Sequence, residues 1–200
     1  YYLAIHDLEI RGAGELLGSN QSGEIHEIGF NLYIDMLNQA VKVIKSGKTL
    51  DIDNPISTKK EINLHAPAIL TESYCRNANE RLIIYKRLSS CKDTEELKLM
   101  KEELIDRFGV MPEQTQNLII LHQLRLDIEQ YDVEKIDAGK SSIEITFKPD
   151  ANIDPIKLID LIQTNKTIKM NGPKKIKSIV SIEDLKKRSN FITKLLKEIV

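Results

Sequence analysis

The chain has 200 residues, of which 41% are hydrophobic and 30% are charged, and its formal net charge is −1 at pH 7. This length is enough for one substantial core or two small ones, and the composition is ordinary for a globular protein. No apolar run approaches the ~18–20 residues of a membrane span. The first residues also lack the basic-then-apolar order of a signal peptide. We therefore expect a cytoplasmic protein with no membrane partner.

The charge is unevenly distributed along the chain. Residues 1–60 hold 6 basic and 8 acidic side chains, residues 61–150 hold 12 and 17, and residues 151–200 hold 11 and 5. The basic last quarter is suited to phosphate, but it lacks the interleaved aromatic residues of a single-strand binder. The acidic middle would repel a phosphate backbone. A solvated surface is the simpler interpretation, and a DNA-binding region is the alternative.

The first distinctive pattern is the glycine-rich stretch from His6 to Gly23, HDLEIRGAGELLGSNQSG. Its glycines are Gly12, Gly14, Gly18 and Gly23. Glycine costs about 0.5–1 kcal/mol relative to alanine inside a regular element, so this stretch is better suited to a compact loop. Arg11 and Gln21 would supply a fixed cation and an amide for hydrogen bonds. A structural turn between two helices is the other interpretation that the residues leave open.

An amphipathic helix is predicted from Phe30 to Ile44. Its apolar residues recur at helical spacing, namely Phe30, Tyr33, Ile34, Leu37, Val41 and Ile44. Gly47 is suited to the left-handed conformation that ends a helix. The polar residues 48–60 have little periodicity and are the best candidate for a linker.

Residues 61–66 alternate apolar and polar side chains before Pro67, which predicts an edge strand or an extended arm. A helix around 79–91 would place Leu82, Tyr85 and Leu88 on one face. Arg81 and the two basic residues at 86 and 87 would make the rest of that helix basic.

Two further helices are predicted next. Asp93 is suited to cap one of them, with Glu96 reaching back as in a capping box, and Gly109 ends it. Another helix begins near Pro112, at a first helical turn, and extends as far as Tyr131.

The last third mixes periods of two and 3.6. Strands are predicted at 133–137 and 142–148, and a hairpin pairs 167–170 with 175–179 around Asn171-Gly172-Pro173. A short helix opens at Asp154-Pro155 and carries Leu158, Ile159 and Ile162. The final helix begins at Ser181, where Ser181 and Asp184 form a weak capping signal. We predict an α+β fold in which a small, mainly antiparallel sheet is covered by the two later helices.

Residues suited to catalysis are sparse. The chain contains no GxxxxGK[ST] loop and no acidic box for magnesium, so these residues should not hydrolyse ATP. Cys75 and Cys91 lie in separate segments without metal-ligand spacing, which favours free thiols. His65 has no neighbour at metal-ligand spacing and is best interpreted as a strand histidine. We expect no catalytic residue, no metal site and no cofactor in these 200 residues.

The glycine-rich stretch closely resembles a known motif. DLEIRGAGELLG followed by QSG resembles the TRG motif ("translocation in RecG") of RecG-type helicases and of the bacterial transcription-repair coupling factor family. EIGFNLYIDMLNQAV, NERLIIYKRLSSCK, ELIDRFGVMPEQ and the Asn171-Gly172-Pro173 hairpin resemble the C-terminal part of the coupling factor family, in the same order. RecG shares only the opening motif. Ser19-Asn20 departs from the family, whose members tend to carry acidic residues there.

The resemblance implies a function for the whole protein and three segments in this chain. The family's proteins are ATP-driven and magnesium-dependent translocases on double-stranded DNA that push stalled RNA polymerase off damaged DNA and recruit excision repair through UvrA. Residues 1–47 would hold the end of the element that couples the motor to DNA, with Arg11 and Gln21 as its key polar residues. Residues 48–60 would be a linker. Residues 61–200 would form a C-terminal regulatory domain that packs on the UvrA-binding N-terminal module of the same chain and hides it.

The residues themselves suggest where that packing occurs. Glu102, Glu103 and Asp106 project from one predicted helix as a compact acidic patch, suited to a basic docking surface. A plain solvated helix face is the alternative, because exposed ion pairs contribute only about 0–1 kcal/mol each. Two other functions stay open: a DNA-binding module acting through the basic C-terminal region, and a fragment of a RecG-type helicase.

Overall fold

The computed structural model describes residues 60–199. The predicted glycine-rich loop, the predicted helix from Phe30 to Ile44 and the linker up to residue 59 lie outside this range. The described residues form an α+β fold of five helices and one five-stranded sheet, which confirms the predicted fold class. The elements are β1 (Glu61–Asn63), α3 (Ala78–Ser90), α4 (Thr94–Phe108), α5 (Glu113–Asp127), β2 (Val133–Ala138), β3 (Ser142–Phe147), α6 (Pro155–Thr164), β4 (Ile168–Met170), β5 (Lys175–Ile179) and α7 (Leu185–Ile199).

The sheet has the strand order β1-β2-β3-β5-β4. β1 pairs in parallel with β2, and the other three pairings are antiparallel. The predicted edge strand is therefore present, although it is only three residues long. The predicted hairpin is confirmed, because β4 pairs with β5. The predicted strands at 133–137 and 142–148 are present as β2 and β3, which pair with each other with a register shift between Val133 and Lys135.

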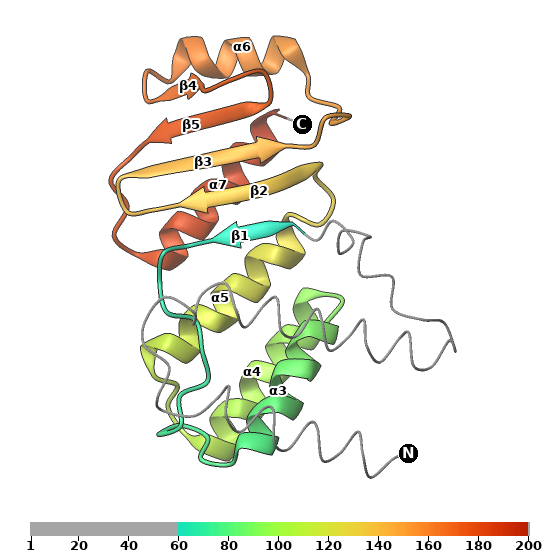
Figure 1. Cartoon of the computed structure of the whole chain (residues 1–200), viewed down its shortest axis with the longest axis vertical. Coiled ribbons are helices and arrows are strands. Elements are labelled where there is room, and N and C mark those ends of the chain that lie inside the picture. The colour runs from blue at the N-terminus through green and yellow to red at the C-terminus, as the bar shows by residue number, and fades with distance from the viewer. Residues whose placement is uncertain (1–59, 200) are drawn as a thin grey trace, which may run out of the picture.

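One face of the sheet is apolar and the other is polar. In β3 the alternate residues Ile143, Ile145 and Phe147 are buried, whereas the residues between them are half-buried. α7 crosses behind the sheet, and the C-terminal half of α5 packs against α7 on the same side (Figure 1). α6 lies along the β4 edge and packs on β4 and α7. The two later helices cover the sheet as predicted, and α5 adds to that cover.

Two hydrophobic cores lie one above the other along the molecule. The larger core joins the sheet to α7, α6 and the end of α5. The smaller core joins α3, α4, the start of α5 and the segment from Ala68 to Cys75. Helix α5 contributes Leu118 to the smaller core and Leu124 to the larger one, so it connects the two.

The predicted signals at both ends of α4 are confirmed. The Asp93 side chain accepts a hydrogen bond from the Glu96 backbone N–H (2.9 Å), and the Glu96 carboxylate accepts one from the Lys92 N–H (2.8 Å). Gly109 follows the last turn at φ 82°, a conformation that favours glycine, and its N–H donates to the Ile105 carbonyl. These bonds satisfy polar groups at both ends of the helix.

Two predicted helix boundaries are wrong. Helix α5 ends at Asp127 and not at Tyr131, because the chain leaves the helical path at the C-cap Ile128. Helix α7 begins at Leu185 and not at Ser181, and its cap is Asp184, whose carboxylate accepts from the Lys187 N–H at 2.7 Å.

Two arginines are buried where the sequence predicted no buried cation. Arg188 is 2% exposed, and its guanidinium donates to the carbonyls of Leu64 (2.7 Å) and Ala138 (2.9 Å). Arg81, which was expected on the basic surface of α3, is 4% exposed and donates to the Cys75 carbonyl at 2.6 Å. Both side chains therefore tie separate segments together through backbone oxygens.

Candidate functional site

The predicted acidic patch lies on α4. Glu102 and Asp106 are exposed and four residues apart, so they occupy the same face of the helix one turn from each other. Neither carboxylate is held in a hydrogen bond or an ion pair within the part of the chain that the structure describes. They are therefore available to a partner.

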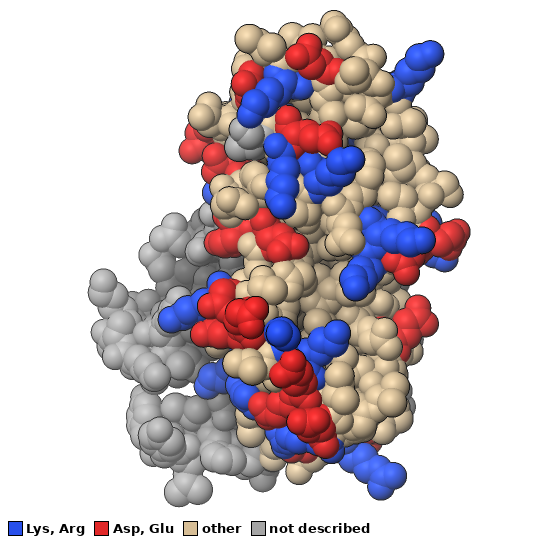
Figure 2. Space-filling model, turned by 180° about the vertical axis from the view of Figure 1, so that it is seen from behind, with Lys and Arg blue, Asp and Glu red and all other residues tan. Residues whose placement is uncertain are grey.

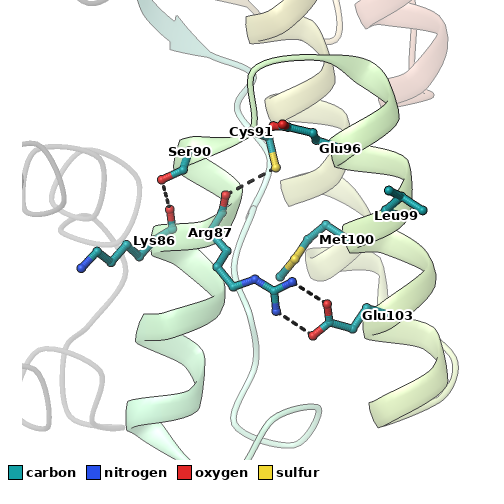
Figure 3. Close-up of a pocket in the computed structure, with 8 residues that line it drawn as sticks. All are labelled: Lys86, Arg87, Ser90, Cys91, Glu96, Leu99, Met100 and Glu103. Carbon is teal, nitrogen blue, oxygen red and sulfur yellow. Dashed lines mark hydrogen bonds and ion pairs between the residues drawn. The ribbon is translucent and has the colours of Figure 1, made fainter.

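Glu103 is placed differently from its two neighbours. Its carboxylate accepts two hydrogen bonds from the Arg87 guanidinium on α3, at 2.7 and 2.5 Å (Figure 3). It accepts a third from Arg107 at 3.0 Å. The hydrogen bonds from Arg87, and then those from Arg107, hold the pKa of Glu103 at about 2, well below its ordinary value. The same pairing raises the pKa of Arg87. Two guanidinium groups thus offset the charge of Glu103, and its carboxylate joins α3 to α4.

Arg107, in the last turn of α4, belongs to the same group of ion pairs. Its second guanidinium nitrogen contacts the Glu80 carboxylate of α3, and its central carbon lies 5.0 Å from the Phe108 ring centroid. The Phe108 ring in turn lies 5.5 Å from that of Tyr74, whose hydroxyl donates to the Leu104 carbonyl at 2.8 Å. Side chains on both helices and on the preceding segment therefore connect α3 to α4.

A shallow groove of about 480 Å³ lies between α3 and α4 next to the acidic patch. Its lining is Lys86, Arg87, Ser90, Cys91, Glu96, Leu99, Met100 and Glu103 (Figure 3). Leu99 is 64% exposed and lies three residues before Glu102, so it shares the helix face that carries the acidic patch. The groove therefore combines apolar surface with charge of both signs, which suits a protein partner better than a small polar ligand.

The groove cysteine shows no sign of activation. The Cys91 thiol contacts the Arg87 carbonyl at 3.4 Å, and burial raises its pKa. A raised pKa keeps the thiol protonated, whereas nucleophilic cysteines need the thiolate. Cys75 and Cys91 are both free, as predicted.

The other candidate groups do not assemble a catalytic or metal site. His65 lies beyond the end of β1, in a bend with φ 49°, so its interpretation as a strand histidine is wrong. It is an exposed residue whose Nε2 lies 2.7 Å from an Asp137 carboxylate oxygen of β2. Among residues 60–199, no group of three or more His, Cys, Asp and Glu side chains is arranged to hold a metal. Within the same range, no helix is long and apolar enough to cross a membrane.

The predicted motor–DNA coupling residues lie outside the described residues. They are Arg11, Gln21, Gly12, Gly14, Gly18 and Gly23. Of the two predicted sites, the described residues therefore contain the acidic patch.

The charged surface is mixed on the helix-covered side of the molecule. Figure 2 shows Lys and Arg interspersed with Asp and Glu over that face, with no continuous stripe of one sign. A mixed surface gives little long-range attraction for a polyanion. This face is thus a poor candidate for the DNA-binding region that the basic last quarter suggested.

Sequence reasoning missed the two arginines that pair with Glu103. The Arg107 contact had a visible signal, because Glu103 and Arg107 are four residues apart on one helix. The Arg87 contact had none, since it depends on how α3 packs against α4.

The fold and the α4 surface define a class of protein domain: an α+β domain with an exposed, charged helical face. Comparisons with known proteins identify the family. Residues 64–158 match the model of the TRCF domain. Over all of its 200 residues the chain is 42% identical to the transcription-repair-coupling factor of Haemophilus influenzae and 35% identical to that of Escherichia coli. The chain belongs to the transcription-repair coupling factor family.

The chain corresponds to a small part of those relatives. It spans 18% of the Haemophilus influenzae protein and 17% of the Escherichia coli protein. A crystal structure of the C-terminal domain of transcription-repair coupling factor has the same fold, with a TM-score of 0.58 and 18% sequence identity. That match covers 72% of this chain and 94% of the other. The family assignment thus rests on the sequence, and the crystal structure supports the fold.

Proposed function

We propose that this chain serves an ATP-dependent translocase on double-stranded DNA, which removes stalled RNA polymerase and recruits excision repair through UvrA in the cytoplasm. ATP and magnesium would act at a motor that these 200 residues do not contain. Residues 1–47 would couple that motor to DNA. Residues 61–200 would regulate it by packing on the UvrA-binding N-terminal module. Family membership supports the first part of this proposal, and the surface of α4 supports the last.

The observation that carries the regulatory role is the pair of free carboxylates on a rigid helix. Glu102 and Asp106 are exposed on α4, which Arg87 and Arg107 fix in place through Glu103. A fixed helix loses little conformational freedom when it binds, so its surface charges need no reordering. We propose that Glu102 and Asp106 contact basic groups of the N-terminal module, and that Glu103 keeps this face of the helix in position.

Charge reversal of the free pair tests the proposal. In the complete protein, Glu102→Lys with Asp106→Lys should release the N-terminal module and raise UvrA binding at least tenfold in a pull-down or surface-based assay. The matched control is Glu134→Lys with Asp150→Lys, which makes the same charge change at exposed sites away from α4. Unchanged UvrA binding in the α4 variant would contradict the proposal, as would an equal rise in the control.

The proposed coupling role of residues 1–47 has its own test. Arg11→Ala or Gln21→Ala in the complete protein should abolish translocation and polymerase release while much of the ATPase activity remains. The reason is that a coupling element transmits motion and does not hold the nucleotide. The glycines at 12, 14, 18 and 23 would allow the tight backbone path of this loop. Retained translocation in both variants would rule out the assignment.

A further inference from the structure

The β4–β5 hairpin gathers an excess of positive charge that the proposed function does not use. From Leu161 to Ile182 the sequence has no aspartate or glutamate and has five lysines, namely Lys166, Lys169, Lys174, Lys175 and Lys177. The register of the hairpin sets Lys169 directly opposite Lys177. Like charges directly opposite each other destabilise a pair of strands. On its other side Lys177 lies directly opposite Glu144 of β3, so one carboxylate offsets part of this repulsion, and the five lysines still outnumber it.

Few acidic groups offset this charge. Glu144 of β3 has one carboxylate oxygen 3.8 Å from the Lys175 ammonium, and its other oxygen accepts a hydrogen bond from Asn171 at 2.7 Å. Within residues 60–199, no carboxylate lies at ion-pair distance from the ammonium of Lys169 or Lys177, nor from those of the lysines at 166 and 174. The hairpin thus keeps most of its positive charge.

The charged side of the hairpin faces away from the helices that cover the sheet. Ile168, Ile176 and Ser178 are buried on the core side. The alternate residues Lys169 and Lys177 point to the other face, where Lys169 is exposed and Lys177 half-buried. α7 and α5 cover only the apolar face of the sheet, and α6 lies beside the β4 edge (Figure 1). The described helices therefore leave the lysine face accessible.

We propose that the polar face of the β4–β5 hairpin binds the phosphate backbone of a nucleic-acid duplex. Lysine binds phosphate as a point charge and does not read bases, whereas arginine is the usual base reader. The only arginine between Lys148 and Asn190 is Arg188, which is buried. The same range contains no aromatic residue on which unpaired bases could stack. The side chains of the hairpin thus favour a duplex held without sequence preference.

This surface is distinct from the docking surface on α4 and from the coupling residues at 1–47. Its binding is expected to be weak, because only three or four phosphates can be neutralised by Lys169, Lys177 and their neighbours. Each neutralised phosphate adds about 0.9 to the steepness of the log–log dependence of affinity on salt. A slope of about −3 is therefore expected for the intact surface.

Fluorescence anisotropy with a labelled duplex of random sequence tests the proposal on the full 200-residue chain. Lys169→Glu with Lys177→Glu should weaken binding at low salt at least tenfold and flatten the salt slope. Lys169→Arg with Lys177→Arg keeps the charge and should retain binding. The control is Lys186→Glu with Lys187→Glu, which makes the same charge change at exposed positions of α7 and should have a clearly smaller effect. Circular dichroism checks that each variant is folded, and Lys169→Gln with Lys177→Gln replaces the reversal if it is not.

Several outcomes would overturn the proposal. The first is that the parent chain does not bind duplex at low salt. The second is that the α7 control loses as much binding as the hairpin variant. The third is that a polyglutamate peptide binds more tightly than duplex, which would assign the surface to an acidic protein. The α4 variant Glu102→Lys with Asp106→Lys should not weaken duplex binding. The hairpin proposal and the regulatory proposal can therefore fail independently.

Discussion

Arg188 holds together segments that are far apart in the sequence. Its guanidinium donates to the carbonyls of Leu64, after β1, and Ala138, at the end of β2. It also donates to the carbonyls of Ile182 and Glu183, both at 3.2 Å. Burial lowers the pKa of Arg188, but a guanidinium stays charged in proteins. Replacing a buried charged donor leaves several carbonyls without partners.

We expect Arg188→Met to lower the free energy of unfolding by about 2–4 kcal/mol, because the variant buries unpaired carbonyls. Arg188→Lys should also be destabilising, since one ammonium cannot reach all four acceptors. Lys187→Met, at an exposed neighbouring position, should change stability by only about 0.5 kcal/mol or less. Urea denaturation followed by circular dichroism measures all three, and an Arg188→Met variant as stable as the parent would contradict the assigned role.

His122 gives the molecule a predicted sensitivity to mild acid. Burial, and then the charge of Arg125, lower the pKa of His122 to about 4 in the folded protein, from an ordinary value of 6.5. The unfolded chain therefore binds more protons than the folded chain between pH 6.5 and pH 4. The contribution of His122 to the free energy of unfolding is complete above pH 6.5, and it is lost as the pH falls from 6.5 to 4. His122→Gln should flatten this slope in unfolding titrations at pH 4 to 7. An unchanged slope would show that other groups cause the acid sensitivity.

At the scale of single elements, helix caps decide where helices begin. Asp184 caps α7, and its backbone carbonyl also accepts the Arg188 N–H. Asp184→Ala should therefore cost about 1 kcal/mol of stability. Ser181→Ala should cost much less, since α7 begins at Leu185, four residues after the serine cap that the sequence predicted. Thermal melts of the two variants make the comparison, and equal losses would contradict the structural assignment of the cap.

The elements show which features a sequence can predict. Periodicity and capping residues located every described helix, and the Asn171-Gly172-Pro173 turn located a hairpin, because these signals are local. The parallel pairing of β1 with β2 was not predictable, since its partners Ile62 and Ile136 are far apart in the chain. The arginine pairs of Glu103 and the burial of Arg81 were missed for the same reason. The acidic patch was found from helical spacing, but which of its members are free depends on tertiary packing.

At the scale of the whole molecule, α5 connects the two cores, and we expect them to unfold cooperatively. Leu104 belongs to the smaller core and Ile145 to the larger, and each is 0% exposed. Because α5 supplies side chains to both cores, the loss of one core removes packing from the other.

We expect Leu104→Ala and Ile145→Ala each to lower stability by about 2–5 kcal/mol and to leave a single unfolding transition. Circular dichroism and tyrosine fluorescence test this, because Tyr85 lies in the smaller core and Tyr131 in the larger. Coincident curves from the two probes would indicate one cooperative unit. Separate transitions would show that the two cores unfold independently.

Lys60 determines how mechanical load from the preceding segment would enter this domain. Its ammonium donates to the carbonyls of Ile128 and Glu129 at the end of α5, at 2.5 and 2.6 Å, and β1 begins at the next residue. A pull on the chain at residue 59 would therefore act first on these two hydrogen bonds and on a three-residue strand at the sheet edge. Ile62 is the β1 residue that packs against the larger core, so under tension β1 would detach before the rest of that core is disturbed. The domain could in this way be extended by the length of one strand and still remain folded.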